Sequence, residues 1–250
     1  MNTSLLNRRT IRRYADRDID PNRLNGLLAL AARTQTMGNL QLYSVIVTTS
    51  AEGKAALAPS HFNQPMTTQA PVVLTICADF RRTSRWAECR RAVPGYNNFL
   101  SFLNAATDAL LYTQTFCNLA EAEGLGLCYL GTTLYNPQPI IDALKLPQLV
   151  FPVATLTVGW PDEVPALSDR LPLESFVHSE TYHDPTPDDI DRYYTPKEQL
   201  PENRHFVELN QKETLAQIFT DIRYTREANE SCSQALLDAL RNQGFLGNEE

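Results

Sequence analysis

The sequence predicts a domain of the α/β or α+β class, in which a β-sheet carries helices on its faces. Four apolar runs rich in β-branched residues have the length of strands and occupy residues 42–49, 71–79, 127–130 and 151–160. Helical patterns fill most of the intervals between these runs. Strands that alternate with helices in this way are typical of a sheet covered by helices.

The helices before the second strand are predicted from their ends and their periodicity. Residues 3–8 form a short first helix, followed by an extended or turn segment through Asp18. Asp20 and Pro21 are the N-cap and first residue of the next helix. Its apolar face has helical spacing and consists of Leu24, Leu27, Leu28 and Ala31. A polar loop at 34–39 and a short helix at 51–58 complete this part.

The longest helical pattern in the chain covers residues 98–123. It is apolar around most of its circumference, which places it in a core or at a subunit interface. Gly124 ends it. The preceding residues 80–97 are basic and aromatic and contain Pro94-Gly95, so we expect a mobile excursion there. A further short helix is expected at 139–144.

The chain changes character at about Asp162, where it becomes rich in proline, tyrosine and acidic residues. Late helices are predicted near 212–223 and 231–243. The weak apolar periodicity argues against a second independent domain. We therefore predict a core at 1–161 and, within the same domain, a C-terminal extension at 162–250 that wraps the core or a neighbouring subunit.

The composition excludes several classes of protein. With 250 residues, a net charge of -7 and a pI near 5.2, the chain lacks the broad basic surface of a general nucleic-acid-binding protein. It has no run of ~18 apolar residues that would span a membrane. Its first ten residues lack the apolar core of a signal peptide, so we expect a cytoplasmic protein. The five cysteines are odd in number and contain no CxxC pair, which disfavours a disulfide framework or a zinc site.

Four arginines within six residues, Arg8-Arg9-Thr10-Ile11-Arg12-Arg13, stand out in this acidic chain. Such a group indicates either a local anion site, for example for a phosphate, or a solvated basic face of a helix. The glycines form no GxGxxG and no GxxxxGK[ST] motif, so no glycine loop is present to bind a dinucleotide or triphosphate. If the protein is an enzyme, a cofactor held by other means would supply its chemistry.

Four separated segments together resemble the flavin-dependent nitroreductases. They are Arg8-Arg9-Thr10-Ile11-Arg12, residues 36–41 (TMGNLQ), residues 123–131 (EGLGLCYLG), and residues 158–161 (VGWP) followed by 169–172 (DRLP). They are similar to that family's RRSxR, SSxNxQ and ExLGLGxxxxG motifs and to the phosphate-binding segment of its NADPH-preferring flavin reductase and group A nitroreductase branch. The resemblance runs in order through residues 5–185.

This resemblance implies a homodimeric, mostly antiparallel α+β fold with the subunits intertwined and FMN bound at their interface. It implies ping-pong hydride transfer from NADPH, or NADH, through FMN to nitroaromatics, quinones or flavins. The flavin performs the redox chemistry, so no catalytic side chain is expected. Two alternatives are a noncatalytic FMN-binding protein for redox sensing or flavin storage, and a phosphate-binding structural protein.

The resemblance also assigns the cofactor-binding residues one by one. They are Arg8, Thr10 and Arg12 of the first segment, Thr36, Met37, Gly38 and Gln41 of the loop, Gln64, the strand end Tyr129, Leu130, Gly131 and Thr132, and Arg170. Lys197 is assigned to the nicotinamide substrate, with a solvated lysine as the alternative. The chain departs from the family at Thr36 and Met37, where serines are usual, at Thr132, where a second glycine is usual, and at Ser168, where a basic residue is usual.

Two sets of arginines have other expected roles. Alternate residues of an extended segment face opposite sides, so Arg9 and Arg13 should point away from the ligand and be solvated or paired with acids. The excursion carries Arg81, Arg82, Arg85, Trp86, Arg90 and Arg91. These side chains form either a lid over the substrate or a solvated basic loop.

Overall fold

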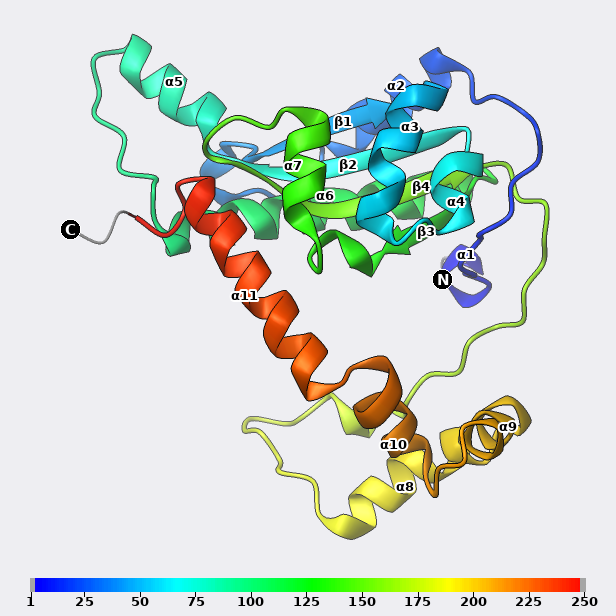
Figure 1. The fold of residues 1–250 in the computed structure, drawn as a ribbon. Coiled ribbons are helices and arrows are strands. Elements are labelled where there is room, and N and C mark those ends of the chain that lie inside the picture. Colours follow the sequence, from blue (N-terminus) through cyan, green and yellow to red (C-terminus); the bar gives the residue numbers. More distant parts are fainter. Residues whose placement is uncertain (1–2, 248–250) are drawn as a thin grey trace. The chain divides into compact units, whose positions relative to one another are not determined.

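The fold is built on a four-stranded sheet, seen in a computed structural model that describes residues 3–247 (Figure 1). The strands are β1 (Tyr43–Thr48), β2 (Val72–Asp79), β3 (Gly126–Leu130) and β4 (Val150–Gly159), in the order β1-β2-β4-β3. Every neighbouring pair is antiparallel. This pairing identifies the fold as α+β and confirms the predicted antiparallel sheet with flanking helices.

Helices cover both faces of the sheet, and the alternation along β2 shows it. Val72, Leu74 and Ile76 belong to the main core, which also contains the buried side of α6 (Phe99–Ala122). Val73 packs instead with Leu57 of α3 (Ala51–Leu57) and Ile140 of α7 (Pro137–Leu144). Successive residues of a strand face opposite sides, so α6 lies on one face and α3 and α7 lie on the other.

The long central helix is placed by its cap and by a neighbouring helix. Asn98 accepts a hydrogen bond from the Ser101 amide and so caps α6 as its N-cap residue. Helix α2 (Pro21–Ala31) packs on α6, and the Tyr112 hydroxyl donates to the Leu28 carbonyl at 2.9 Å. Asp20 caps α2 through the Asn22 amide at 2.9 Å, which confirms the predicted helix start.

Two glycines let the N-terminal segment lie directly on the sheet. A Cβ at Gly126 of β3 would come within 2.7 Å of the Ile11 side chain. A Cβ at Gly159 of β4 would come within 2.7 Å of Tyr14 and 2.6 Å of Pro71. The segment that carries the clustered arginines therefore runs against the β3 edge, held by contacts that a larger residue would obstruct.

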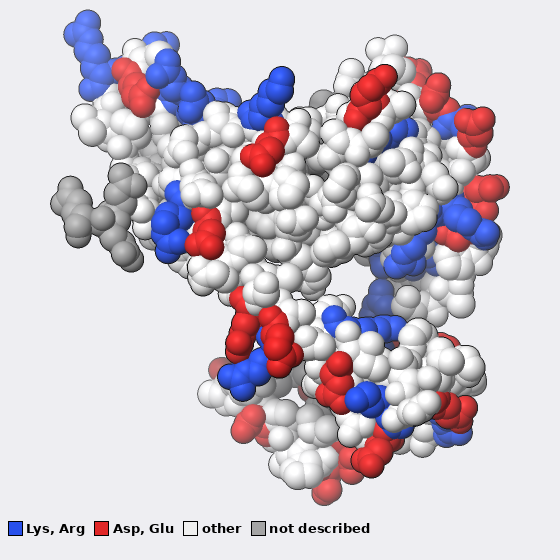
Figure 2. Space-filling view, in the orientation of Figure 1, with Lys and Arg blue, Asp and Glu red and all other residues white. Residues whose placement is uncertain are grey.

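The expected mobile excursion is wrong in part, because residues Arg81–Cys89 form helix α5. Asp79 accepts a hydrogen bond from the Arg82 amide at 3.1 Å and satisfies the first turn, while Thr83 and Ser84 are buried. No buried apolar stripe reveals the helix, because its buried residues are polar and Trp86 is exposed. Figure 2 shows the basic side chains gathered over this helix.

Two helices that the sequence did not predict follow the core, α8 (Pro187–Glu198) and α9 (Pro201–Leu209). Helix α8 starts with a capping box in which Thr186 and Asp189 exchange hydrogen bonds. Its buried residues are Asp189 and Tyr193, too few to give an apolar stripe. Local capping, rather than periodicity, marks this helix.

The chain divides into two compact units. The first contains the sheet and comprises residues up to Ala166 together with those from Cys232 on, and the second comprises Leu167–Ser231. The second unit holds α8, α9, α10 (Leu215–Ile218) and a π-helical turn at Phe219–Arg223. Helix α11 (Arg226–Asn242) leads back to the first unit, where Ala239 and Leu240 join the core.

Short elements complete the fold. They are α1 (Thr3–Leu6), α4 (Pro65–Gln69) and 3₁₀ turns η1 (Met37–Asn39), η2 (Ala58–His61), η3 (Gly131–Thr133) and η4 (Leu173–Ser175). Among residues 3–247, no helix is both long and apolar enough to cross a membrane.

Candidate functional site

The N-terminal segment is bound along the outer edge of β3. The Ile11 amide donates to the Leu127 carbonyl at 3.0 Å, and Ile11 is buried against Gly126. Further on, Tyr14 forms a β-bridge with Pro161. Thr10 and Arg12, on either side of Ile11, are therefore held beside β3.

The second and fourth of the clustered arginines bond away from this edge. The Arg9 Nε donates to the Pro165 carbonyl at 2.7 Å, and the Arg13 Nε lies 3.1 Å from a carboxylate oxygen of Glu163. The predicted pairing of Arg13 with an acid is confirmed, while Arg9 binds a carbonyl group instead.

Glu163 also fixes the backbone of this segment. Its Oε1 accepts the Arg12 amide at 2.6 Å and the Arg13 amide at 3.0 Å. The hydrogen bond from the Arg12 amide, followed by that from Arg13, lowers the pKa of Glu163 below its ordinary value. Sequence reasoning missed this residue, which lies beyond β4 in a region without periodicity.

Arg8 and Arg12 both lie close to the buried thiol of Cys128. Burial raises the pKa of Cys128, and the charges of Arg12 and Arg8 oppose that rise. Arg8 also faces Glu121 of α6, at 3.8 Å between Nη1 and Oε1. Arg12 forms no ion pair with an acid within the described part of the chain. The charges of Arg8 and Arg12 thus both act on one thiol of β3.

The end of β3 is open to a ligand. Tyr129 is 47% exposed, and Leu130 is buried. At Gly131, which begins turn η3, an added Cβ would have no described heavy atom within 4 Å outside its immediate neighbours. Thr133 closes the turn by donating to the Leu130 carbonyl at 2.9 Å. The backbone at Gly131 is therefore accessible to a ligand.

Gln64 lies near the same strand. It is the N-cap residue of α4, whose Met66 packs against Cys128 and Leu130 of β3 in a small cluster that Tyr14 joins. The structure thus gathers one group of predicted site residues along β3: Arg8, Thr10, Arg12, Gln64, Tyr129, Leu130, Gly131 and Thr132.

The predicted loop at 36–41 lies at the other edge of the sheet, immediately before β1. Gly38, Asn39 and Gln41 all have positive φ, at 54°, 56° and 48°. Two non-glycine residues in this region make the loop strained, so its surroundings must hold it.

A buried carboxylate closes this loop. Asp108 of α6 is 1% exposed; its Oδ1 accepts the Met37 amide at 2.7 Å and its Oδ2 accepts the Leu42 amide at 3.1 Å. Sequence reasoning missed Asp108. An acid between Ala105 and Tyr112 on the apolar face of a helix was the available signal.

The excursion helix holds the same loop from outside. Arg82 of α5 donates through Nη2 to the Gln41 carbonyl and through Nη1 to the Tyr43 carbonyl, the latter at 3.1 Å. The Gln41 side chain bonds to the Asn39 side chain at 2.6 Å. Arg82 therefore supports the 36–41 loop, a role that neither a lid nor a solvated loop describes.

One chain does not bring the two groups together. Strands β2 and β4 separate β1 from β3, and strands spaced about 4.8 Å apart put the two edges roughly 14 Å from each other. Arg170 and Lys197 belong to the second unit. There the Arg170 Nη1 donates to the Asp169 carbonyl at 2.7 Å, and Lys197 forms a 2.9 Å ion pair with the Asp169 carboxylate.

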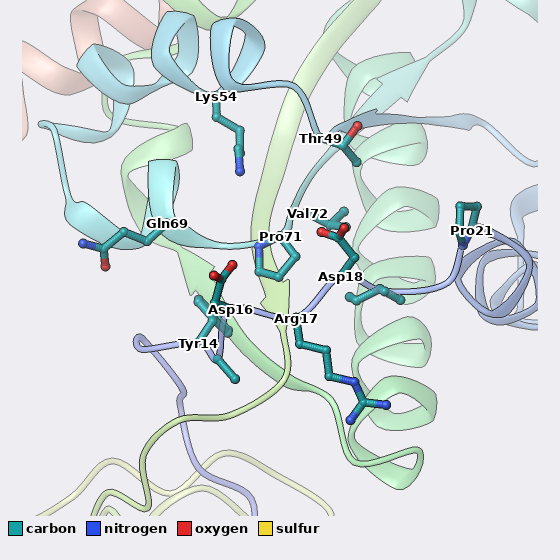
Figure 3. A pocket seen from close by; sticks show the side chains of 12 residues that line it. Tyr14, Asp16, Arg17, Asp18, Pro21, Thr49, Lys54, Gln69, Pro71 and Val72 are labelled. Atoms are coloured by element: carbon teal, nitrogen blue, oxygen red, sulfur yellow. The ribbon is translucent and has the colours of Figure 1, made fainter.

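A pocket of about 590 Å³ lies elsewhere, between the segment 14–19 and the region of Lys54, Gln69 and Pro71. Figure 3 shows Asp16, Asp18 and Lys54 around it, and Lys54 donates to the Ala70 carbonyl at 2.8 Å. None of the predicted site residues is among the described residues that line it.

The fold and site define an α+β protein whose antiparallel sheet has an arginine-bearing segment and a glycine turn at one edge. The chain belongs to the nitroreductase family, because the model of that family matches residues 5–160.

Named relatives support this assignment. The chain is 34% identical over 181 residues to an FMN reductase [NAD(P)H] of Bacillus subtilis, covering 72% of this chain and 73% of the relative. It is 33% identical over 178 residues to an oxygen-insensitive NADPH nitroreductase of Salmonella typhimurium, covering 71% and 72%.

Solved structures are similar along nearly the whole chain. A Bacteroides fragilis protein matches with 61% identity and a TM-score of 0.96, over 98% of this chain and 99% of that one. The NfrA1 nitroreductase of B. subtilis matches with 26% identity and a TM-score of 0.85, over 98% of each chain.

Proposed function

We propose that this protein is an FMN-dependent oxidoreductase that takes a hydride from NADPH, or NADH, and passes it to nitroaromatics, quinones or flavins in a ping-pong cycle. Relatives named FMN reductase and NADPH nitroreductase support this activity. The observation that carries the proposal is that the charges of Arg8 and Arg12 both act on Cys128 of β3, the strand that ends at the open Gly131 turn. We retain the predicted cytoplasmic location as part of the proposal, because reduced nicotinamides are available there.

The charges at this edge fit a phosphate group. Arg8 lies 3.8 Å from Glu121, beyond hydrogen-bonding distance, so its N–H donors remain available. Arg12 is exposed and has no acid partner among residues 3–247. Guanidinium groups bind phosphate through charge-assisted hydrogen bonds, and Arg8 and Arg12 would hold it without a glycine loop.

The end of β3 fits a flat ring. The absence of a side chain at Gly131 lets a ligand approach the backbone, and Gln64 and Thr132 would supply hydrogen-bonding groups. When bound, FMN supplies the hydride chemistry that no side chain here provides. Arg12 and backbone amides would stabilise the negative charge of the reduced ring.

We infer that the protein acts as a homodimer. A second copy would bring its 36–41 loop, with Thr36, Met37, Gly38 and Gln41, to the β3 edge that the first copy's own loop does not reach. Helix α6 offers an interface, because it has an exposed apolar side at helical spacing, made of Phe99, Leu100, Leu103, Leu110 and Leu111. Such contiguous apolar surface is typical of association sites.

Anaerobic mixing of the FMN-loaded protein with NADPH tests the activity. We expect rapid loss of flavin absorbance, faster than with NADH, and reoxidation by a quinone or a nitroaromatic. Flavin that binds but keeps its absorbance would instead support a sensing or storage protein.

The cofactor assignment has its own test. Fluorescence titration with FMN should show one tight site per chain, which Arg12→Gln weakens and the matched surface variant Arg90→Gln leaves intact. A protein that binds no added FMN would contradict the proposal. Sedimentation equilibrium checks the dimer, with Leu103→Glu on the exposed side of α6 expected to give monomers.

A further inference from the structure

His61 is a fully buried residue that hydrogen-bonds to both Gln64 and Thr132, two residues proposed to face the flavin. It ends the 3₁₀ turn η2 and is 0% exposed. Its ring Nδ1 lies 2.8 Å from the hydroxyl oxygen of Thr132, in turn η3. Its backbone carbonyl accepts the Gln64 amide at 3.1 Å. A single side chain and its own backbone therefore connect Gln64 to the Gly131–Thr133 turn.

The chain between His61 and Gln64 has an unusual conformation. Phe62 and Asn63 have φ of 53° and 54°, so two consecutive non-glycine residues are left-handed. The Asn63 amide donates to the Ala58 carbonyl at 2.8 Å and the Phe62 amide to the Pro59 carbonyl at 3.1 Å. Such residues persist only where the surrounding structure fixes them. The buried ring of His61 is part of that surrounding structure.

The hydrogen bonds of the His61 ring indicate which atom is the donor. Its Nε2 is buried without a partner among the described residues, so the bond to Thr132 is the only one that the ring makes. Burial lowers the pKa of His61 to about 4, so the ring is neutral at ordinary pH. A hydrogen on Nε2 would be an orphaned buried donor, which proteins avoid. The favoured tautomer therefore carries its hydrogen on Nδ1 and donates to the Thr132 oxygen.

This arrangement decides what Thr132 can do. Because its oxygen accepts the hydrogen of His61, its own hydroxyl hydrogen is directed elsewhere. Thr132 is 9% exposed and directly follows Gly131, whose backbone is accessible to a ligand. Among the described residues this hydroxyl hydrogen-bonds only to His61, so its hydrogen is available to a group bound at the open end of β3.

We propose that His61 is a positioning residue with two roles. It holds the segment Phe62–Gln64 against the Gly131–Thr133 turn, and it orients the Thr132 hydroxyl as a donor to the bound flavin. This inference rests on the proposed function. It assigns a role to Thr132 at the position where the chain departs from the family pattern, and to a histidine outside all four of the segments that resemble the family.

Four single variants, one double variant and one control test the proposal by FMN affinity and by the FMN midpoint potential. His61→Phe and Thr132→Val each remove the hydrogen bond, and each should weaken FMN binding roughly tenfold and lower the midpoint potential. The double variant should be no weaker than either single variant. His61→Asn keeps a donor near the position of Nδ1 and Thr132→Ser keeps the hydroxyl, so both should bind FMN as the wild type does.

The control is Ser60→Ala. Ser60 is also 0% exposed and next to His61, but its hydroxyl has no described partner, so its loss should leave affinity and potential unchanged. Additive losses in the double variant, or a folded His61→Phe protein with wild-type affinity and potential, would overturn the inference while the proposed function stands. A wild-type protein that binds no FMN would overturn both.

A measurement on the protein without flavin covers the case in which His61→Phe does not fold. Nitrogen-15 NMR of the His61 ring should show the hydrogen on Nδ1, with a shift in the Nδ1 resonance on Thr132→Val. A hydrogen on Nε2, or a resonance unaffected by Thr132→Val, would contradict the proposed hydrogen bond.

Discussion

The two edges of the sheet present two segments of the proposed site that are held in different ways. At the β3 edge, Glu163 accepts the amides of Arg12 and Arg13 from a segment that lies on Gly126 and Gly159. At the β1 edge, Asp108 accepts the amides of Met37 and Leu42 from within the core.

The difference lies in burial. Asp108 is 1% exposed, whereas the side chain of Glu163 is 17% exposed and also pairs with an arginine at the surface. A carboxylate that bonds to amides in the core leaves them unsatisfied when it is removed, while water can replace one at the surface. The comparison teaches that the strained β1-edge loop should depend on its carboxylate more strongly than the extended segment does.

The largest effect is expected at Asp108. Asp108→Ala leaves a buried amide, that of Leu42, and a part-buried amide, that of Met37, without an acceptor, and should lower the free energy of unfolding by about 3–5 kcal/mol. Urea unfolding measures the loss. The matched control is Asp142→Ala, since Asp142 is an exposed acid on α7 whose carboxylate bonds, among residues 3–247, to the Gln138 side chain alone. Equal losses in the two variants would contradict the proposed dependence of the β1-edge loop on Asp108.

Next in size is a pH effect at the β3 edge. The pKa of His61 is about 4 in the folded protein against an ordinary 6.5, so the unfolded chain binds the extra proton between these values. The contribution of neutral His61 to the free energy of unfolding should therefore be fully present above pH 6.5. About 3 kcal/mol of it should be lost as the pH falls to 4. Unfolding midpoints across this range measure the slope, and His61→Asn should flatten it. A His61→Asn protein with an unchanged slope would mean that other groups carry the effect.

A smaller effect should distinguish the arginines that face the proposed ligand from those that bond away. Arg8→Gln and Arg12→Gln each remove a charge-assisted contact and should cost about 1.5–3 kcal/mol of FMN binding, as measured by fluorescence titration. Arg9→Gln should cost less, because Arg9 binds the Pro165 carbonyl. Equal losses at Arg9 and Arg12 would contradict the alternation along this segment.

The smallest effect is expected at Glu163. Its lowered pKa means that its contribution to stability is present above about pH 4.5 and is lost as the pH falls through the folded-state value. Glu163→Gln keeps one acceptor and should lower the free energy of unfolding by only about 1 kcal/mol at pH 7. A loss as large as that at Asp108 would show that exposure does not separate the two carboxylates.

Periodicity explains what the sequence could predict of the fold. The strands and α2 and α6 bury an apolar face, so their residues reveal them, and Asp20 and Asn98 mark helix starts at the expected places. Helices α5, α8 and α9 bury few or no apolar residues, and of these three only α8 starts with a capping box. No apolar pattern was present to predict them.

The site was predictable in its parts and not in its arrangement. The segments around Arg12, Gly38 and Gly131 can be found from their motifs, but only the strand order shows that the loop of Gly38 lies at the far edge of the sheet. The supporting residues Asp108, Glu163 and Arg82 bond to backbone groups that are distant along the chain. A single sequence does not reveal such contacts, because the partner is a peptide group common to every residue.

The close packing at Gly126 has a practical consequence for genetic screens. A methyl group there would collide with Ile11 and displace the neighbouring arginines without altering any of them. We therefore expect a random-mutagenesis screen for colonies that lack the yellow colour of bound flavin to recover Gly126→Ala and Gly159→Ala. A map of ligand contacts would overlook these substitutions.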